Sequence, residues 1–185
     1  MCGRYYIEVE DSELRSIIAE VERNTAVKTG EVFPTNHAPV RAPDGSLIAM
    51  RWGFPRFDGK GEIINARSET AAVKTMFRRP MMEGRCLIPA SWYFEWEKRG
   101  GQKVKYALMP PGGNIVWMAG LSRTDSKTGG QSFVILTRPA WDGISFIHDR
   151  MPVILPKERH DEWLNGHDPD STMEQAINKV NYRAI

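Results

Sequence analysis

The sequence predicts a mixed α+β fold, in which one domain is built around a curled, mostly antiparallel, barrel-like β-sheet with a few flanking helices. Short β-like runs dominate the chain, and turn residues separate them. Only a few segments have helical periodicity. A length of 185 residues suits one domain with a real core, and no segment has the character of an interdomain linker. We therefore expect residues 1–185 to form a single domain.

The strands are predicted from apolar runs bounded by glycine, proline and aspartate. In the first half of the chain they cover residues 3–9, 46–52 and 62–66. In the second half they cover residues 85–90, 92–97, 104–109, 115–121, 132–137 and 151–155. Pro152 lacks an N–H donor, so the last strand is expected to lie at an edge or to contain a bulge.

Four segments are predicted to be helical. Asp11-Ser12 caps the first helix, whose apolar face consists of Leu14, Ile17, Ile18 and Val21. A short second helix runs from Ser68 through Phe77, and Pro80 closes it from beyond. Pro156 starts a third helix, which carries Trp163 and Leu164. A capping box over residues 171–174 opens a terminal helix with an apolar side formed by Met173, Ile177 and Val180.

The composition is that of an ordinary globular protein, with 41% hydrophobic and 26% charged residues. There is neither a signal-peptide pattern nor an apolar run long enough to span a membrane, so we expect a cytoplasmic protein. The four histidines show no metal-ligand spacing, and we expect no metal and no cofactor. A formal net charge of +2 permits a local basic groove but does not establish nucleic-acid binding.

Cys2 is the most informative position, because its chemistry depends on whether Met1 is removed. A cysteine at the start of a chain carries an α-amine and a thiol on adjacent carbons. The amine condenses with an aldehyde to an imine, and the thiolate then closes a five-membered thiazolidine ring with a large effective molarity. The alternative is that Cys2 is simply a small residue near a frayed chain end.

Asn65 and Arg67 lie on one face of the predicted strand, whereas Ile64 and Ala66 lie on the other. An amide and a guanidinium side by side at the start of a helix suit contacts with a sugar and a phosphate. The alternative is an asparagine that makes turn hydrogen bonds, next to an exposed arginine.

The segment 92–97 alternates between two sides of a strand. We expect Trp92, Phe94 and Trp96 to face the core and Glu95 to lie on the opposite side, among aromatic rings. Partial desolvation would raise the pKa of Glu95 and suit it to proton transfer near neutral pH. The alternative is an ordinary acid on a solvent-facing strand.

His148 stands in a loop between Ile147 and Asp149, close to Arg150 and a Met-Pro bend. A lone histidine is usually structural, but these neighbours indicate a histidine held near an anionic ligand. Together with Glu95 it would form a proton-transfer pair.

The sequence resembles the SRAP family, the SOS-response-associated peptidases or abasic-site processing proteins, in blocks that run through nearly the whole chain. The blocks are Met1-Cys2-Gly3-Arg4, residues 33–36, 38–40, 51–54, 64–70 and 85–90, Trp92-Tyr93-Phe94-Glu95-Trp96, and residues 147–153. Any one of them would be weak evidence. Their joint occurrence, in order and behind Met-Cys-Gly-Arg, is highly specific.

The resemblance implies a DNA-damage protein that senses abasic sites in single-stranded DNA and shields them through a thiazolidine crosslink. By position, Cys2 is the nucleophile, Asn65 orients the sugar, Glu95 manages protons and assists crosslink reversal, and His148 assists ring opening and any strand-cleaving lyase step. The implied DNA contacts are Arg4, Trp52, Arg67 and Arg150. The partner is single-stranded DNA with an abasic site, near the nucleoid, and the protein is expected to be a monomer.

Two other classes of protein remain open from the sequence. One is a non-covalent module that binds single strands through backbone shape and charge. The other is a cysteine-type peptidase, including one that processes itself, because members of the family have been described as peptidases and hydrolases. No Asn/Asp-oriented Cys–His signature supports an external protease.

Overall fold

A closed β-barrel forms the centre of the molecule in a computed structural model that describes residues 2–113, 115–126 and 128–185. Its strands follow one another around the ring in the order β11 (Val116–Thr124), β8 (Arg85–Ala90), β3 (His37–Arg41), β4 (Leu47–Trp52) and β12 (Gln131–Pro139). Pairing of β11 with β12 closes the ring. All the contacts are antiparallel except the one between β12 and β4. The predicted α+β class with a barrel-like, mostly antiparallel sheet is confirmed.

Two short strands extend this sheet beside β12. They are β7 (Asn65–Arg67), which runs parallel to β12, and β13 (Arg150–Pro152), which runs antiparallel to it. Because β13 pairs with β12 alone among the described strands, the prediction that Pro152 belongs to an edge strand is confirmed.

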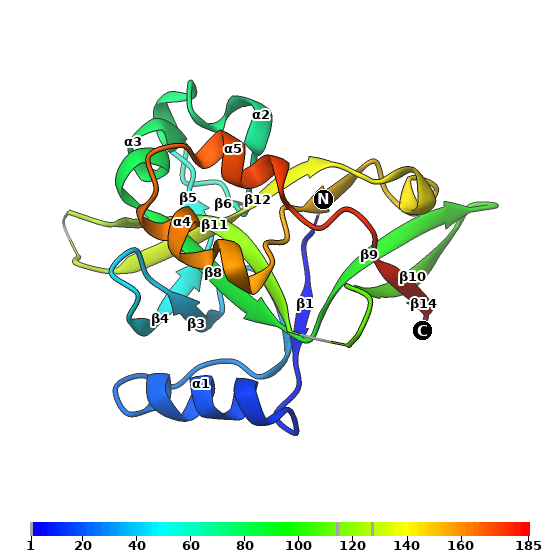
Figure 1. Cartoon of the computed structure of the whole chain (residues 1–185), viewed down its shortest axis with the longest axis horizontal. Coiled ribbons are helices and arrows are strands. Elements are labelled where there is room, and N and C mark those ends of the chain that lie inside the picture. Colours follow the sequence, from blue (N-terminus) through cyan, green and yellow to red (C-terminus); the bar gives the residue numbers. More distant parts are fainter. Residues whose placement is uncertain (1, 114, 127) are drawn as a thin grey trace.

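A second sheet leans against the barrel and reaches away from it at the right of Figure 1. It contains, in spatial order, β14 (Asn181–Ala184), β10 (Gln102–Met109), β9 (Trp92–Arg99), β1 (Tyr5–Ile7) and β2 (Gly30–Val32). A small third sheet joins β5 (Phe54–Pro55) to β6 (Glu62–Ile63). The N-terminal strand β1 thus lies between β9 and β2, where it is paired on both sides.

Alternating side chains of the barrel strands fill two separate apolar clusters. One set, which includes Ile88, Met118 and Phe133, packs inside the barrel together with residues from β1. The other set, which includes Leu87 and Ala119, packs outward under helices. Since both faces of β8 are covered, all six of its residues are buried, and its sequence is nearly continuously apolar.

The helices cover the outer face of the barrel or its open end. They are α1 (Ser12–Glu22), α2 (Ser68–Ala71), α3 (Thr75–Glu83), α4 (His160–Asn165) and α5 (Pro169–Glu174). The predicted first helix is confirmed: the Asp11 side chain accepts the Leu14 N–H at 2.9 Å, and the four predicted apolar residues are buried. The predicted third helix is confirmed too, with a 3-10 turn (Lys157–Arg159) before α4.

The prediction of one helix from Ser68 to Phe77 is wrong, because the chain forms two helices with a turn between them. Pro80 does not close α3 from beyond but lies inside it. The helix continues past this proline to Glu83, with the Pro80 ring buried against the barrel and its carbonyl oxygen accepting the Gly84 N–H.

The predicted strand over residues 62–66 is divided at Ile64. The Ile64 carbonyl oxygen accepts the indole N–H of Trp52 at 3.0 Å and the backbone N–H of Ile135 at 3.0 Å. At this residue the chain passes from β6, which pairs with β5, to β7, which pairs with β12. The predicted strand over residues 3–9 is shorter than expected, and β2 and β3 occur where no strand was predicted.

The predicted terminal helix is wrong in both its start and its length. Asp168 caps α5 by accepting the Ser171 N–H at 3.0 Å, and Pro169 occupies the first turn. Beyond Glu174 the chain turns back, since the Ile177 N–H donates to the Ile154 carbonyl oxygen at 2.8 Å. The chain then adds β14 to the second sheet.

A buried arginine fastens the helices to the barrel. Arg85 is 8% exposed, and its guanidinium donates to the carbonyl oxygens of Met81, Trp163 and Gly166. These three oxygens lie at the ends of α3 and α4, where carbonyl groups lack intrahelical partners. Within the described residues, no helix is both long and apolar enough to cross a bilayer.

Replacement of Gly120 by alanine is expected to destabilise the barrel. A Cβ atom there would lie 2.4 Å from Ile88 Cδ1 and 2.8 Å from the Val134 carbonyl oxygen. We expect Gly120→Ala to lower the free energy of unfolding by about 1–3 kcal/mol in urea titrations. Gly130→Ala is the matched control, because its Cβ would meet only the Thr128 hydroxyl at 3.2 Å. Equal losses in the two variants would contradict close packing at Gly120.

Candidate functional site

The pairing of β1 with β9 places the start of the chain beside Glu95. Tyr5 lies opposite Tyr93, and the Phe94 N–H donates to the Arg4 carbonyl oxygen at 2.9 Å. Because the two strands are antiparallel, the residues before Arg4 run toward the far end of β9. Cys2 is therefore brought close to a carboxyl that lies more than ninety positions away in the sequence.

The Cys2 side chain is fully buried, and its thiol donates a weak hydrogen bond to the Arg4 carbonyl oxygen at 3.6 Å. Burial raises the pKa of this thiol well above its usual range, and the negative charge of Glu95 raises it further. The thiol form is therefore favoured in this state. Cys86, the second cysteine, is buried as well and lies in β8.

Asn65 contacts Cys2 directly. Its side-chain amide donates to the Cys2 carbonyl oxygen at 2.9 Å, from the first position of β7. The amide oxygen, Oδ1, is buried and accepts no hydrogen bond from another described residue. One end of the amide thus holds the backbone of Cys2, while the other end can accept a hydrogen bond from a ligand hydroxyl.

Glu95 is 3% exposed, and burial raises its pKa to about 7. The nearby charge of Asp149 is a smaller contribution in the same direction. The expected desolvation of Glu95 is confirmed, but the expectation that only the Trp92, Phe94 and Trp96 side of segment 92–97 faces the core is wrong. Tyr93, Phe94 and Glu95 are all buried, whereas Trp92 and Trp96 are only half-buried.

Two tyrosine hydroxyls lie in the same interior. The side chains of Tyr5 and Tyr93 are fully buried, and neither hydroxyl has a hydrogen-bond partner among the described residues. Burial raises the pKa of both phenols, and the charge of an ionised Cys2 would raise them further. Both hydroxyls are therefore protonated donors close to Cys2. Sequence reasoning missed them, because only the β1–β9 register brings them together.

His148 has a partner for Nδ1 in either protonation state. In the neutral ring Nδ1 accepts the Arg150 backbone N–H at 3.0 Å. In the protonated ring the same nitrogen would face the Asp149 carboxylate, 2.8 Å away. Burial lowers the pKa of His148, which favours the neutral ring. Asp149, which also influences Glu95, links the histidine loop to the site around Cys2.

Two predicted DNA contacts are corrected. Trp52 is fully buried inside the barrel, stacked 6.2 Å from the Phe133 ring, so it offers no surface to a strand of DNA. Arg150 is 7% exposed, and its guanidinium binds both oxygens of Glu69 and the Thr137 carbonyl oxygen. This pairing lowers the pKa of Glu69 to about 2, so the charge of Arg150 is already neutralised.

Arg4 and Arg67 remain near the surface. Arg67 is exposed at the end of β7. The Arg4 guanidinium lies 4.4 Å from the Phe33 ring centre and 5.2 Å from that of Trp96. Arg4 also pairs with Glu31 at 3.2 Å. A cation held between two aromatic rings is a suitable contact for a base or a phosphate.

Arg138, which sequence reasoning did not single out, lies on β12 beside the edge strand β13. Its Nη1 atom is buried and has no hydrogen-bond partner among the described residues. The side chain is only half-buried overall, so it is a further basic group near the same end of the barrel. The sequence offers only a weak indication that Arg138 lies near the site, because an arginine in a strand is most often exposed to solvent.

No cluster of three or more metal-binding side chains occurs among the described residues. A hollow of about 710 Å³ lies elsewhere on the molecule, between α3 and the β11–β12 hairpin, and none of the candidate residues lines it. The size of that hollow does not make it the candidate site, because the candidate nucleophile Cys2 and the Glu95 carboxyl, whose pKa is raised, lie elsewhere.

The fold and the site define a β-barrel protein whose candidate nucleophile comes from the start of the chain rather than from a barrel strand. A sequence model of the SOS response associated peptidase (SRAP) family matches residues 1–184. The chain belongs to this family.

Several relatives carry names that describe what they do. The chain is 33% identical to the abasic site processing protein YoqW of Bacillus subtilis, over 96% of this chain and 86% of that one. It is 31% identical to the abasic site processing protein YedK of Escherichia coli, over 89% and 79%. A crystal structure from Bordetella bronchiseptica superposes with a TM-score of 0.80 at 24% identity, over 100% of this chain and 99% of that one. That likeness supports the fold.

The raised pKa of Glu95 predicts that stability falls as the pH rises. An unfolded chain ionises glutamate near pH 4.3, so the folded protein binds this proton more tightly. The contribution is complete below that pH and is lost as the pH rises through about 7. Its size is about 3 kcal/mol. In urea titrations across this window, Glu95→Gln should lack this loss. Parallel curves for the two proteins would contradict the assignment.

Proposed function

We propose that this protein captures abasic sites in single-stranded DNA as a covalent thiazolidine crosslink through Cys2, once Met1 has been removed. The observation that carries the proposal is that Asn65 holds the Cys2 backbone while Glu95, with a pKa raised to about 7, lies beside it. The substrate class follows from the names of the relatives YoqW and YedK. The crosslink would protect the lesion from strand cleavage.

The chemistry begins at the α-amine of the mature Cys2. An α-amine titrates near 7.7–8.0, so roughly a tenth of it is unprotonated at neutral pH. Its nitrogen adds to the aldehyde carbon of the ring-opened sugar to give a carbinolamine. Protonation of the hydroxyl releases water and leaves a protonated imine. The thiolate then adds to its carbon, a carbon–sulfur bond forms, and the electron pair of the carbon–nitrogen double bond moves to the nitrogen, which keeps its N–H in the closed ring.

Glu95 is the proposed acid and base for these steps. Its pKa of about 7 allows it to give a proton to the departing hydroxyl and to take one from the Cys2 thiol. The transfer from the thiol matters because burial holds the pKa of Cys2 high. When the crosslink is reversed, the same carboxyl would return a proton to the sulfur as the carbon–sulfur bond breaks.

The remaining roles are assigned by contact. Asn65 would orient the sugar through its unpartnered Oδ1. His148 would assist ring opening and any lyase step by giving or taking a ring proton. Arg150 acts through another residue: its backbone N–H donates to His148 Nδ1, which makes it a positioning residue.

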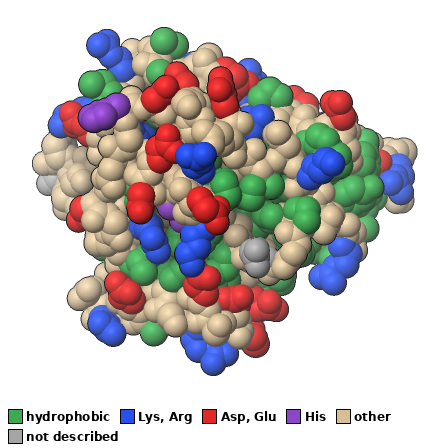
Figure 2. Space-filling view, in the orientation of Figure 1, with side chains coloured by type: hydrophobic (Ala, Val, Ile, Leu, Met, Phe, Trp, Pro, Cys, Tyr) green, Lys and Arg blue, Asp and Glu red, His purple; other side chains and the backbone are tan. Residues whose placement is uncertain are grey.

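We propose that a single strand lies across the surface near Arg4 and Arg67. Exposed aromatic rings, including Phe146 (46%) and Tyr182 (48%), offer platforms for bases. Figure 2 shows a mainly apolar surface over the part of the molecule formed by β9, β10 and β14, with basic side chains at its margins. The protein would act as a monomer, with one chain per crosslinked strand.

Mature protein lacking Met1 is expected to form a heat-stable adduct with a single-stranded oligonucleotide that carries one abasic site. The adduct is detected on a denaturing gel, and intact mass reports both Met1 removal and a one-to-one stoichiometry. Cys2→Ala should form no heat-stable adduct, although borohydride should trap its imine because the amine remains. Cys86→Ala, which removes the other buried thiol, is the control and should crosslink normally. An undiminished heat-stable adduct in Cys2→Ala would contradict the proposed mechanism.

Glu95→Gln and His148→Ala are expected to separate two activities. Glu95→Gln should slow both formation and reversal of the crosslink, by about a hundredfold or more. His148→Ala should chiefly reduce strand cleavage and leave crosslinking largely intact. His167→Ala, an exposed histidine outside the site, is the control. Loss of crosslinking in His148→Ala to the level of Cys2→Ala would contradict this division of roles.

The two rival classes give different results in the same assays. A non-covalent module would bind intact and abasic strands equally, with steep salt dependence and no heat-stable complex. A cysteine-type peptidase would turn over a pool of peptides when Met1 is absent.

A further inference from the structure

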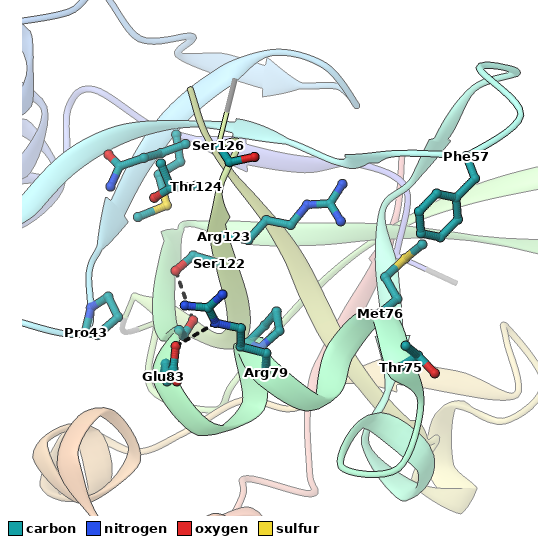
Figure 3. Close-up of a pocket in the computed structure, with 14 residues that line it drawn as sticks. Pro43, Phe57, Thr75, Met76, Arg79, Glu83, Ser122, Arg123, Thr124 and Ser126 are labelled. Atoms are coloured by element: carbon teal, nitrogen blue, oxygen red, sulfur yellow. Dashed lines mark hydrogen bonds and ion pairs between the residues drawn. The ribbon is translucent and has the colours of Figure 1, made fainter. Parts of the chain in front are cut away.

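The hollow between α3 and the β11–β12 hairpin is a half-open trough of about 710 Å³. Its walls come from α3, from the ends of β11 and β12, and from the loop between β5 and β6. Figure 3 shows the Arg123 side chain projecting into its middle, with Phe57 and Met76 on one side and Ser122 and Glu83 on the other. The volume is within the range of ligand sites.

Arg123 carries no ion pair with any residue of the described part of the chain. Its guanidinium lies 4.2 Å from the centre of the Phe54 ring and makes no hydrogen bond or ion pair with another described residue. The side chain is half-buried; the charges of Asp125 and, less strongly, Glu62 act on it, and Glu62 is bound to Arg51 at 2.8 Å. A guanidinium held in place by a ring and left without an acceptor suits a carboxylate.

The second arginine of the trough, Arg79, forms only a weak ion pair. Arg79 pairs with Glu83 at 2.9 Å, but the two side chains are 84% and 62% exposed. Such an exposed pair one helical turn apart contributes little to stability, so Arg79 is able to turn toward a ligand.

The trough also carries exposed apolar side chains. Phe57 is 95% exposed at the loop between β5 and β6, and it faces Met76 across the end of the trough. A second hollow of about 210 Å³ adjoins the first and shares Thr75 and Arg79 with it. Val73 (76% exposed) and Met82 (69% exposed) line this second hollow.

We propose that these two hollows together form a docking site for an acidic peptide segment of a partner protein. A carboxylate of the peptide binds Arg123, with Arg79 assisting, and its apolar side chains fill the space between Phe57 and Met76. A small acid would occupy only one hollow, whereas a peptide chain spans both. Flexible methionine side chains adapt to peptide partners of differing sequence.

A peptide fits this surface better than a nucleic acid. A polyanionic strand needs several cations along its path. Three arginines line the two hollows: Arg79 is ion-paired with Glu83, whereas Arg78 and Arg123 make no ion pair with another described residue. The acid Glu83 among them disfavours a polyanion, and the exposed apolar side chains beside them match a peptide with a few carboxylates. The site shares no lining residue with the candidate site around Cys2, so the proposal stands independently of the crosslinking chemistry.

The test uses fluorescence anisotropy with a fluorescein-labelled peptide in which aspartate alternates with phenylalanine and leucine. We expect the whole protein to bind it, and a version with lysine in place of aspartate to bind at least about tenfold more weakly. Arg123→Gln should weaken binding about tenfold, and Phe57→Ser should weaken it as well. Arg23→Gln, an exposed arginine at the end of α1, is the control and should bind normally.

Unchanged circular dichroism of the variants establishes that they are folded. No binding of the peptide, or equal binding to the wild-type protein and Arg123→Gln, would overturn the proposal. Displacement of the peptide by oligothymidylate, together with loss of oligothymidylate binding in Arg123→Gln, would also overturn it and make the trough a path for nucleic acid.

Discussion

The antiparallel pairing of β1 with β9 is the contact on which the candidate site depends. It holds a three-residue strand between two others, and so it fixes the start of the chain, a place where most proteins fray. The cross-strand partners Tyr5 and Tyr93 are both fully buried. Without this pairing Cys2 would have neither Glu95 nor Asn65 beside it.

Two carboxyl groups show how the environment divides roles among chemically similar side chains. Glu69 accepts from the Arg150 guanidinium, and its pKa falls to about 2. Glu95 is dominated by burial, and its pKa rises to about 7. Glu69 therefore stays ionised near neutral pH, and it holds the side chain of Arg150 in the segment that follows His148. Glu95 changes its protonation near physiological pH, which is the property that proton transfer requires.

Local patterns predicted the parts of the fold that are locally determined. The helix after Asp11 was predicted correctly because its cap and its apolar stripe lie within a few turns. The terminal helix was not, since β14 exists only through pairing with a distant strand. The same reason explains the unpredicted burial of Trp52 and of Tyr93 in β9. Alternation shows that a strand has two faces, but not how much of each face the rest of the chain covers. Family motifs identified Cys2, Asn65, Glu95 and His148 as candidates, whereas the tyrosine hydroxyls required the strand register.

The distance in sequence between β1 and β9 has a consequence for biosynthesis. The segment that covers Cys2 is translated long after Cys2 has left the ribosome, because Tyr93 and Glu95 lie in the middle of the chain. During that interval the amino terminus is part of an open nascent polypeptide and is accessible to processing enzymes. In the proposed mechanism, removal of Met1 would therefore precede folding: the terminus is exposed first, and the folded chain then encloses the thiol.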